Sequence, residues 1–185
     1  MLRCVLVIPF GWLLFVHGHN TTARYLAAAL FVVASITDFL DGAIARKRNL
    51  VTSFGKIADP IADKALTGVA LIGLSVLGEL PWWVTIVMLA REIGVTLIRF
   101  WVIRHGVISA SRGGKAKTVF QIMAIFFYLL PVGGFIHGIG VVAMAIALAL
   151  AIFTGIDYFL RALHLRQTSE RAAQKRAAKA ARSAR

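Results

Sequence analysis

Long apolar stretches alternate with short polar ones along the chain, and this alternation is the clearest structural signal in the sequence. A helix that spans a bilayer needs about 20 predominantly apolar residues. Runs of roughly this length lie at about 2–17, 24–45, 57–78, 81–103, 118–136 and 139–163. The pattern therefore predicts an all-α membrane protein with six transmembrane helices.

The composition agrees with a chain that lies within a membrane. Hydrophobic residues make up 59% of the sequence and charged residues 16%, whereas soluble domains are about 45–50% apolar and about 25% charged. We expect the first run to be a retained span and not a cleaved signal peptide. No small-residue cleavage site precedes residues 17–20, and further apolar runs follow.

Basic residues are distributed unevenly between the two sets of connections. The connections that are rich in Lys and Arg carry Arg46, Lys47, Arg48 and Lys56 after the second run, and Arg104, Arg112, Lys115 and Lys117 after the fourth. The opposite connections hold little beyond Arg24 and Glu79. The bias of Lys and Arg toward the cytoplasmic side predicts that both termini are cytoplasmic in a multi-pass protein of the inner or plasma membrane.

The net charge of +13 is explained mostly by this topology, so no nucleic-acid partner is expected. Residues 164–185 form a basic cytoplasmic tail that carries seven of the Lys and Arg residues. This tail is expected to be flexible or helical and to be attracted to anionic lipid. Residues 1–163 then form a single transmembrane domain.

Four aspartates lie where charge is least expected, between the second and third apolar runs. They are Asp38, Asp41, Asp59 and Asp63. The members of each pair are three or four residues apart, which places them on one face of a helix. A short connection makes the two helices antiparallel neighbours, so the carboxylates face one another. Carboxylates within a membrane protein face a cavity, a partner or an ion, and oxygen ligands without His or Cys favour Mg²⁺ or Mn²⁺.

Small residues accompany these acids at Gly42, Ala45 and Gly55. A structural salt-bridge cluster with Arg46, Lys56 and Lys64 is the alternative, but ion pairing would not require small neighbours. Small side chains allow another molecule to approach the backbone and the metal closely. A phosphate-bearing substrate would be bound in this way.

Taken together, the spacing of these residues resembles the signature of the CDP-alcohol phosphotransferase family. The matching positions are Asp38, Asp41, Gly42, Ala45, Arg46, Gly55, Asp59 and Asp63. The resemblance implies a six-helix membrane enzyme, a homodimer, that transfers a substituted phosphate group from a CDP-linked donor to an alcohol and releases CMP. Residues 1–163 would then be the catalytic domain.

The same resemblance assigns roles to individual residues. Asp38, Asp41, Asp59 and Asp63 are implied to bind the metal, with Asp63 also the general base. Nucleotide binding is implied for Asp38, Gly42, Ala45, Arg46 and Gly55. Independently, cleavage of a pyrophosphate requires charge neutralisation that divalent ions supply, and the attacking hydroxyl must lose its proton to a base.

The acceptor alcohol depends on the second half of the chain. Arg91 lies near the middle of the fourth run, and a basic cluster follows with Ser111, Arg112, Lys115 and Lys117 around glycines that we expect to be flexible. Such a cluster suits a phosphorylated acceptor, although part of it could serve only the topology signal. Residues 81–118 resemble the phosphatidylglycerophosphate synthase branch of the family. This implies CDP-diacylglycerol as donor and sn-glycerol 3-phosphate as acceptor.

Two kinds of alternative stay open. A cardiolipin synthase or a phosphatidylinositol phosphate synthase would share the aspartates and differ in the acceptor pocket. A divalent-ion transporter could also bury carboxylates, but transporters place such sites near the midplane. Here all four acids are expected near the cytoplasmic face.

Overall fold

The computed structural model describes residues 2–48, 55–102 and 112–183, and it describes side chains for residues 5–37, 64–98, 101 and 113–166. Within these ranges the chain forms six α-helices and no strand. The helices are α1 (Leu2–His17), α2 (Thr21–Arg48), α3 (Gly55–Val76), α4 (Trp82–Val102), α5 (Arg112–Leu129) and α6 (Phe135–Ser183). The all-helical prediction is confirmed.

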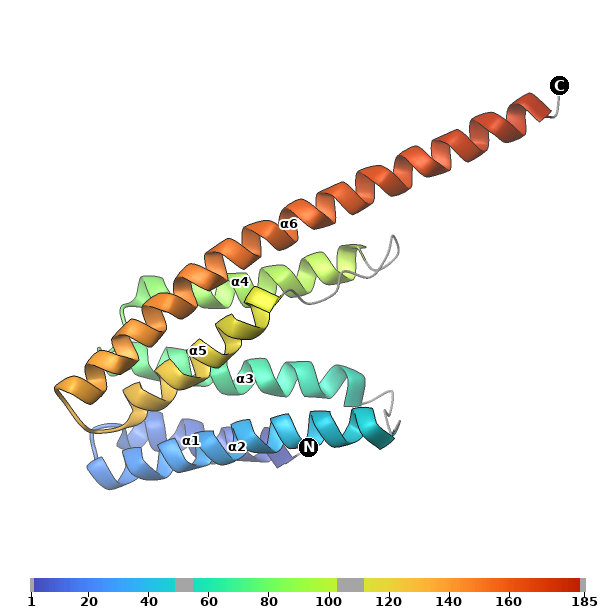
Figure 1. Ribbon diagram of the computed structural model, residues 1–185. Helices are drawn as coiled ribbons and strands as arrows, with labels where there is room; N and C mark the ends of the chain where they lie inside the picture. The colour runs from blue at the N-terminus through green and yellow to red at the C-terminus, as the bar shows by residue number, and fades with distance from the viewer. Residues whose placement is uncertain (1, 49–54, 103–111, 184–185) are drawn as a thin grey trace.

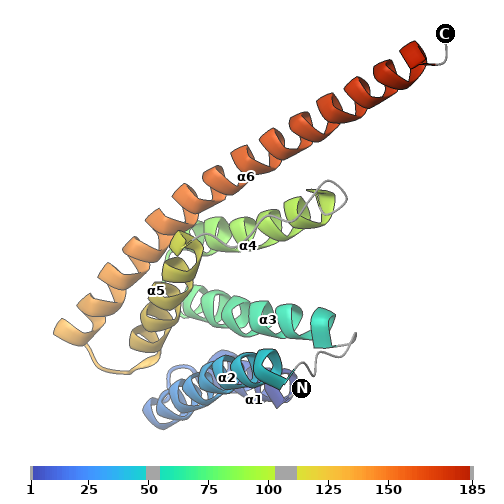
Figure 2. The same ribbon diagram turned by 45° about the vertical axis from the view of Figure 1, so that its right-hand side comes forward.

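The helices form an up-and-down bundle (Figure 1). The connections from α1 to α2, from α3 to α4 and from α5 to α6 lie at one end, which we call the clasp end. The end of α2, the start of α3 and the end of α4 lie at the opposite end, which we call the aspartate end. Helix α6 runs obliquely past its neighbours and projects beyond them at its carboxyl end (Figures 1 and 2).

Helix α1 packs against both α2 and α3, and its buried side chains begin the core. Phe10 and Leu14 are fully buried, and the Phe10 ring lies 5.9 Å from the ring of Phe31 in α2. A Cβ atom at Gly73 of α3 would come within 2.2 Å of Leu14. Glycine at this position therefore allows α1 and α3 to approach closely.

A partly buried ion pair closes the clasp end. Gly78, with φ of 76°, follows α3 and turns the chain so that Glu79 meets Arg24 of α2. Arg24 donates through Nη2 to Glu79 at 2.7 Å and through Nε to the Leu129 carbonyl at 3.2 Å, and it also bonds the Tyr128 carbonyl. The last carbonyls of a helix lack partners within it. Arg24 therefore caps α5 while it joins α2 to the α3–α4 connection.

The fifth helix differs from its predicted span. The apolar run suggested residues 118–136, but α5 begins at Arg112 and ends at Leu129. Pro131 explains the early end, because proline has no N–H group and disfavours helical backbone in the residue before it. The basic stretch from Arg112 to Thr118 is helical, so Gly113 and Gly114 lie in a regular helix and not in a flexible loop.

Much of the described exterior is apolar. Ile8, Trp83, Leu97 and Phe153 are all more than half exposed, and they belong to α1, α4 and α6. One helix, Phe135–Arg166, is long and apolar enough to cross a membrane by length and composition, and shorter apolar helices occur at Val5–His17, Thr21–Thr37 and Lys64–Val76. Large exposed apolar surface is typical of a face that meets lipid or another protein.

Candidate active site

The backbone brings the two aspartate pairs to the same end of the bundle. Asp38 and Asp41 lie in the last turns of α2, and Asp59 and Asp63 lie in the first turns of α3. Gly55 is the first residue of α3. The side chains of all four aspartates, and of Gly42, Ala45 and Arg46 in α2, lie outside the described residues. The metal site and the nucleotide site therefore stay predictions, although the backbone at these positions is helical, as the spacing predicts.

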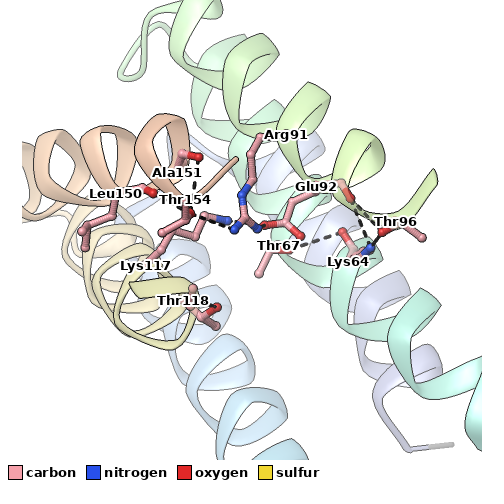
Figure 3. A network of polar contacts seen from close by, with 11 residues as sticks. Lys64, Thr67, Arg91, Glu92, Thr96, Lys117, Thr118, Leu150, Ala151 and Thr154 are labelled. Carbon is pink, nitrogen blue, oxygen red and sulfur yellow. Dashed lines mark hydrogen bonds and ion pairs between the residues drawn. The ribbon is translucent and has the colours of Figure 1, made fainter. Parts of the chain in front are cut away.

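Beside this region, described side chains from four helices form a polar network (Figure 3). Its centre is Glu92 of α4, which forms ion pairs with Arg91 of the same helix and with Lys117 of α5. Lys117 is only 1% exposed. A buried ammonium group is stable only when a counter-charge or strong hydrogen bonds compensate for its lost hydration. Glu92 supplies such a counter-charge.

Arg91 is held from both sides. Its Nη1 atom lies 3.2 Å from Oε1 of Glu92, and its Nη2 atom donates to the hydroxyl oxygen of Thr154 in α6 at 3.0 Å. Its Nε atom is buried and has no hydrogen-bond partner. A buried donor without an acceptor is destabilising by about 1–3 kcal/mol. Arg91 is thus positioned firmly and yet retains an unused donor.

Lys64 connects the start of α3 to α4. Its Nζ atom donates to the Glu92 carbonyl at 3.2 Å and to the Thr96 hydroxyl, which in turn donates to the same carbonyl at 2.8 Å. Lys64 directly follows Asp63 in the chain. These contacts fix α3 against α4 at the residue that follows Asp63, the predicted general base.

Two cavities lie next to α6. A cavity of about 270 Å³ lies between α4 and α6 and is bordered by Arg91, Gly155 and apolar residues including Val95 and Ile156. A second, of about 430 Å³, lies between α5 and α6 and is lined by residues such as Phe120, Met123 and Phe135. Apart from Arg91, these linings suit hydrocarbon and not a sugar phosphate or nucleotide.

The predicted acceptor residues have different surroundings. Arg91 and Lys117 are engaged with Glu92, whereas Lys115 is exposed at the start of α5. Arg112 is the first residue of α5, but its side chain lies outside the described residues, as does Ser111 altogether. Of the predicted group, the described side chains therefore bring together Arg91 and Lys117, through a shared carboxylate.

Sequence reasoning missed the residues that hold these cations. Thr154 and Thr96 carry no charge and occur within apolar runs, and the sequence pattern assigns no role to Glu92. The contacting pairs are also far apart in the chain: Glu92 and Lys117 are 25 positions apart, and Arg91 and Thr154 are 63 positions apart. The available signal was Arg91 itself, because an arginine within an apolar run requires polar partners.

Comparison with known proteins identifies the class of enzyme. The CDP-alcohol phosphatidyltransferase family matches residues 1–153, and the chain therefore belongs to this family of enzymes. This confirms the resemblance that the aspartate spacing indicated.

Individual relatives narrow the class. A probable phosphatidylglycerophosphate synthase of Mycobacterium tuberculosis is 52% identical over 174 residues, which cover 91% of this chain and 83% of the relative. The CDP-diacylglycerol–glycerol-3-phosphate 3-phosphatidyltransferase of Rickettsia typhi is 43% identical over 84% of this chain and 89% of its own length. The enzyme of the same name from Bacillus subtilis is 38% identical over 89% of both chains.

Proposed function

We propose that this protein transfers the phosphatidyl group from CDP-diacylglycerol to sn-glycerol 3-phosphate, giving phosphatidylglycerophosphate and CMP. The observation that carries the proposal is the match along most of the chain to relatives named for this reaction, at 38–52% identity. It agrees with the complete aspartate signature at 38–63 and with the basic residues that follow α4. The reaction belongs to phospholipid biosynthesis.

Asp38, Asp41, Asp59 and Asp63 would hold the divalent cation that enzymes of this family use. An all-carboxylate donor set suits Mg²⁺ or Mn²⁺, and the helical backbone at both pairs is compatible with it. When bound, such an ion neutralises charge that develops on the pyrophosphate oxygens.

Asp63 would accept the proton of the attacking glycerol hydroxyl, so that a bond forms between this oxygen and the phosphorus of the phosphatidyl group as the bond to CMP breaks. In this proposal Asp38, Gly42, Ala45, Arg46 and Gly55 shape the nucleotide pocket. The small residues among them leave room for the CDP group close to the backbone.

The acceptor phosphate would be bound by Arg91, Ser111, Arg112, Lys115 and Lys117. Bidentate and charge-assisted hydrogen bonds from such groups favour a phosphate over a neutral hydroxyl. Plain glycerol would then be a poor substrate. The shared contact of Arg91 and Lys117 with Glu92 supports a common role for these two cations.

The protein would cross the membrane six times as a homodimer in the inner or plasma membrane, with both termini and the active site on the cytoplasmic side. The apolar exterior of α1, α4 and α6 supports membrane embedding. The basic residues between α4 and α5 and beyond residue 163 support the orientation.

The decisive experiment measures CMP release from purified protein in vesicles that contain CDP-diacylglycerol. Glycerol 3-phosphate, glycerol, phosphatidylglycerol and inositol phosphate are offered as acceptors, and we expect turnover with glycerol 3-phosphate. Preference for phosphatidylglycerol would instead indicate a cardiolipin synthase, and preference for inositol phosphate a phosphatidylinositol phosphate synthase. Transport of a divalent ion with no CMP release from any acceptor would indicate the transporter.

A further inference from the structure

Thr154 of α6 forms a directional hydrogen bond with Arg91. Its hydroxyl donates to the Leu150 carbonyl at 2.6 Å, so the single proton of the hydroxyl is used within α6. The hydroxyl oxygen is therefore available only as an acceptor, and Nη2 of Arg91 donates to it at 3.0 Å. This arrangement fixes one edge of the guanidinium relative to α6, as Figure 3 shows.

Two glycines lie beside this contact, and Gly113 is the one where a side chain would clash. A Cβ atom at Gly113 of α5 would come within 2.8 Å of the Thr154 methyl group, closer than real Cβ contacts allow. A Cβ atom at Gly155 would meet Cγ of Arg91 at 3.4 Å. Helices α5 and α6 therefore enclose Thr154, and the Arg91 side chain lies directly against the α6 backbone.

Glu92 holds the guanidinium from the other side. Because its carboxylate also pairs with the buried Lys117, Arg91 and Lys117 are kept near one another around a single negative charge. The guanidinium has five N–H donors, and the contacts to Glu92 and Thr154 leave some of them unused, including the buried Nε–H. An oxyanion that reached this group would satisfy donors that the resting protein leaves without partners.

We propose that Thr154 is a positioning residue for acceptor recognition: it holds Arg91 in the orientation that binds the phosphate of the acceptor. The inference rests on the proposed function, because it assumes a phosphorylated acceptor at Arg91. Thr154 acts through Arg91 and does not touch the substrates. Its contribution is to reduce the conformational freedom that Arg91 would otherwise lose on binding.

The test replaces Thr154 with valine, which keeps the shape and removes the hydroxyl. We expect the KM for glycerol 3-phosphate to rise by about tenfold, the size expected for a hydrogen bond to a charged group. The KM for CDP-diacylglycerol should stay near its wild-type value, and thermal unfolding in detergent verifies that the variant is folded. Thr154→Ser restores the hydroxyl and should restore the KM.

Thr118→Val is the matched control. It makes the same change near the same end of the bundle, but the Thr118 hydroxyl is exposed and donates only to the Gly114 carbonyl of its own helix, at 3.1 Å. We expect this variant to behave like the wild type. An equal rise in the KM of both substrates for Thr154→Val, a KM that matches the control, or a failure of Thr154→Ser to restore it would overturn the proposal.

A double-mutant cycle tests whether Thr154 acts through Arg91. In an Arg91→Gln background, Thr154→Val should produce little further change in the KM for glycerol 3-phosphate. Additive effects would contradict the assigned role. If the wild-type protein does not use glycerol 3-phosphate, the proposed function fails together with this inference. If it does and Thr154→Val resembles Thr118→Val, the inference alone fails.

Discussion

The clasp end and the polar network around Glu92 each pair a glutamate with an arginine, but the two arginines differ in the number of N–H donors that remain unused. At the clasp end, Arg24 uses Nε, Nη1 and Nη2 on Glu79 and on the carbonyls that end α5. In the network, near the middle of α4, Arg91 bonds Glu92 and Thr154, and its Nε atom is buried without a partner.

The difference separates a pairing that only stabilises the fold from one that can also bind a ligand. Every nitrogen of the Arg24 guanidinium donates to an acceptor within the protein, so a bound anion would gain less at the clasp end than at Arg91. Arg91 keeps an unused N–H donor, so the network around Glu92 can still form a hydrogen bond with a bound anion. Substitutions at the clasp end should therefore lower stability, whereas substitutions in the network or at the aspartates should lower activity.

The largest effect is expected from Asp59→Asn or Asp38→Asn, which should abolish turnover. Each change removes a charged oxygen ligand from the proposed metal site and leaves the side-chain volume almost unchanged. CMP release measures activity, and thermal unfolding in detergent should give a value close to the wild type. Asp157→Asn is the control, because Asp157 forms a surface pair with Arg161 at 2.9 Å. Full turnover in excess chelator would refute the metal requirement.

The next effect concerns proton transfer by Asp63. Asp63→Asn keeps the shape and removes the basicity, and loss of a general base lowers kcat by about 100- to 10,000-fold. Asp38, Asp41 and Asp59, together with water and substrate phosphate, can supply enough oxygens for a magnesium ion, so calorimetry in detergent should show nearly normal binding of the metal and of CDP-diacylglycerol. If metal binding is lost as severely as in Asp38→Asn, Asp63 is chiefly a ligand, and the base is another residue.

At the clasp end, Arg24→Met should reduce stability and leave substrate KM values unchanged. The change leaves Glu79 and two carbonyls without their partner. Because Glu79 keeps 28% exposure, we expect a loss of about 3 kcal/mol, the lower end of the range for breaking a buried pair. Thermal unfolding in detergent measures it, with Arg161→Met as the exposed control. An altered KM without loss of stability would contradict the prediction that Arg24 only stabilises the fold.

The smallest effect is expected from Lys115→Gln. Lys115 is exposed, so its attraction for the acceptor phosphate is screened, and the KM for glycerol 3-phosphate should rise by about two- to fivefold. The effect should diminish as salt is added, whereas the KM for CDP-diacylglycerol should not change. Arg161→Gln removes an exposed charge elsewhere and serves as the control. A parallel rise for both substrates would remove Lys115 from the acceptor site.

The sequence was sufficient to predict the helices where apolar periodicity and helix boundaries coincide. Helices α1 to α4 lie close to their predicted spans. Helix α5 does not, because hydropathy treats Pro131 and its neighbours as apolar, whereas the backbone chemistry of proline ends the helix before them. Hydropathy also places the basic residues from 112 to 117 in a loop, because it detects apolar spans and not helices as such. A positively charged segment can be helical, and α5 begins at Arg112.

A site can be proposed from sequence where its residues are close in the chain and charged, and the metal site at the aspartates stays such a prediction. The aspartates satisfied both conditions, and their helical placement agrees with the spacing. Thr154, the partner of Arg91 in α6, satisfied neither, because it is uncharged and distant in the chain. Arg24 and Glu79 offered a weaker clue, since each is an isolated charge in or next to a connection that otherwise carries none, but only the fold brings them together.

The contact between Gly113 and Thr154 has an evolutionary consequence. A side chain at position 113 would collide with the Thr154 methyl group, so glycine is required at position 113 while Thr154 keeps this methyl group. Lineages that acquire alanine at position 113 should carry serine at position 154, which keeps the hydroxyl and removes the methyl group. Correlated substitution at these two positions would indicate that related enzymes retain the hydroxyl at position 154, and with it the orientation of Arg91.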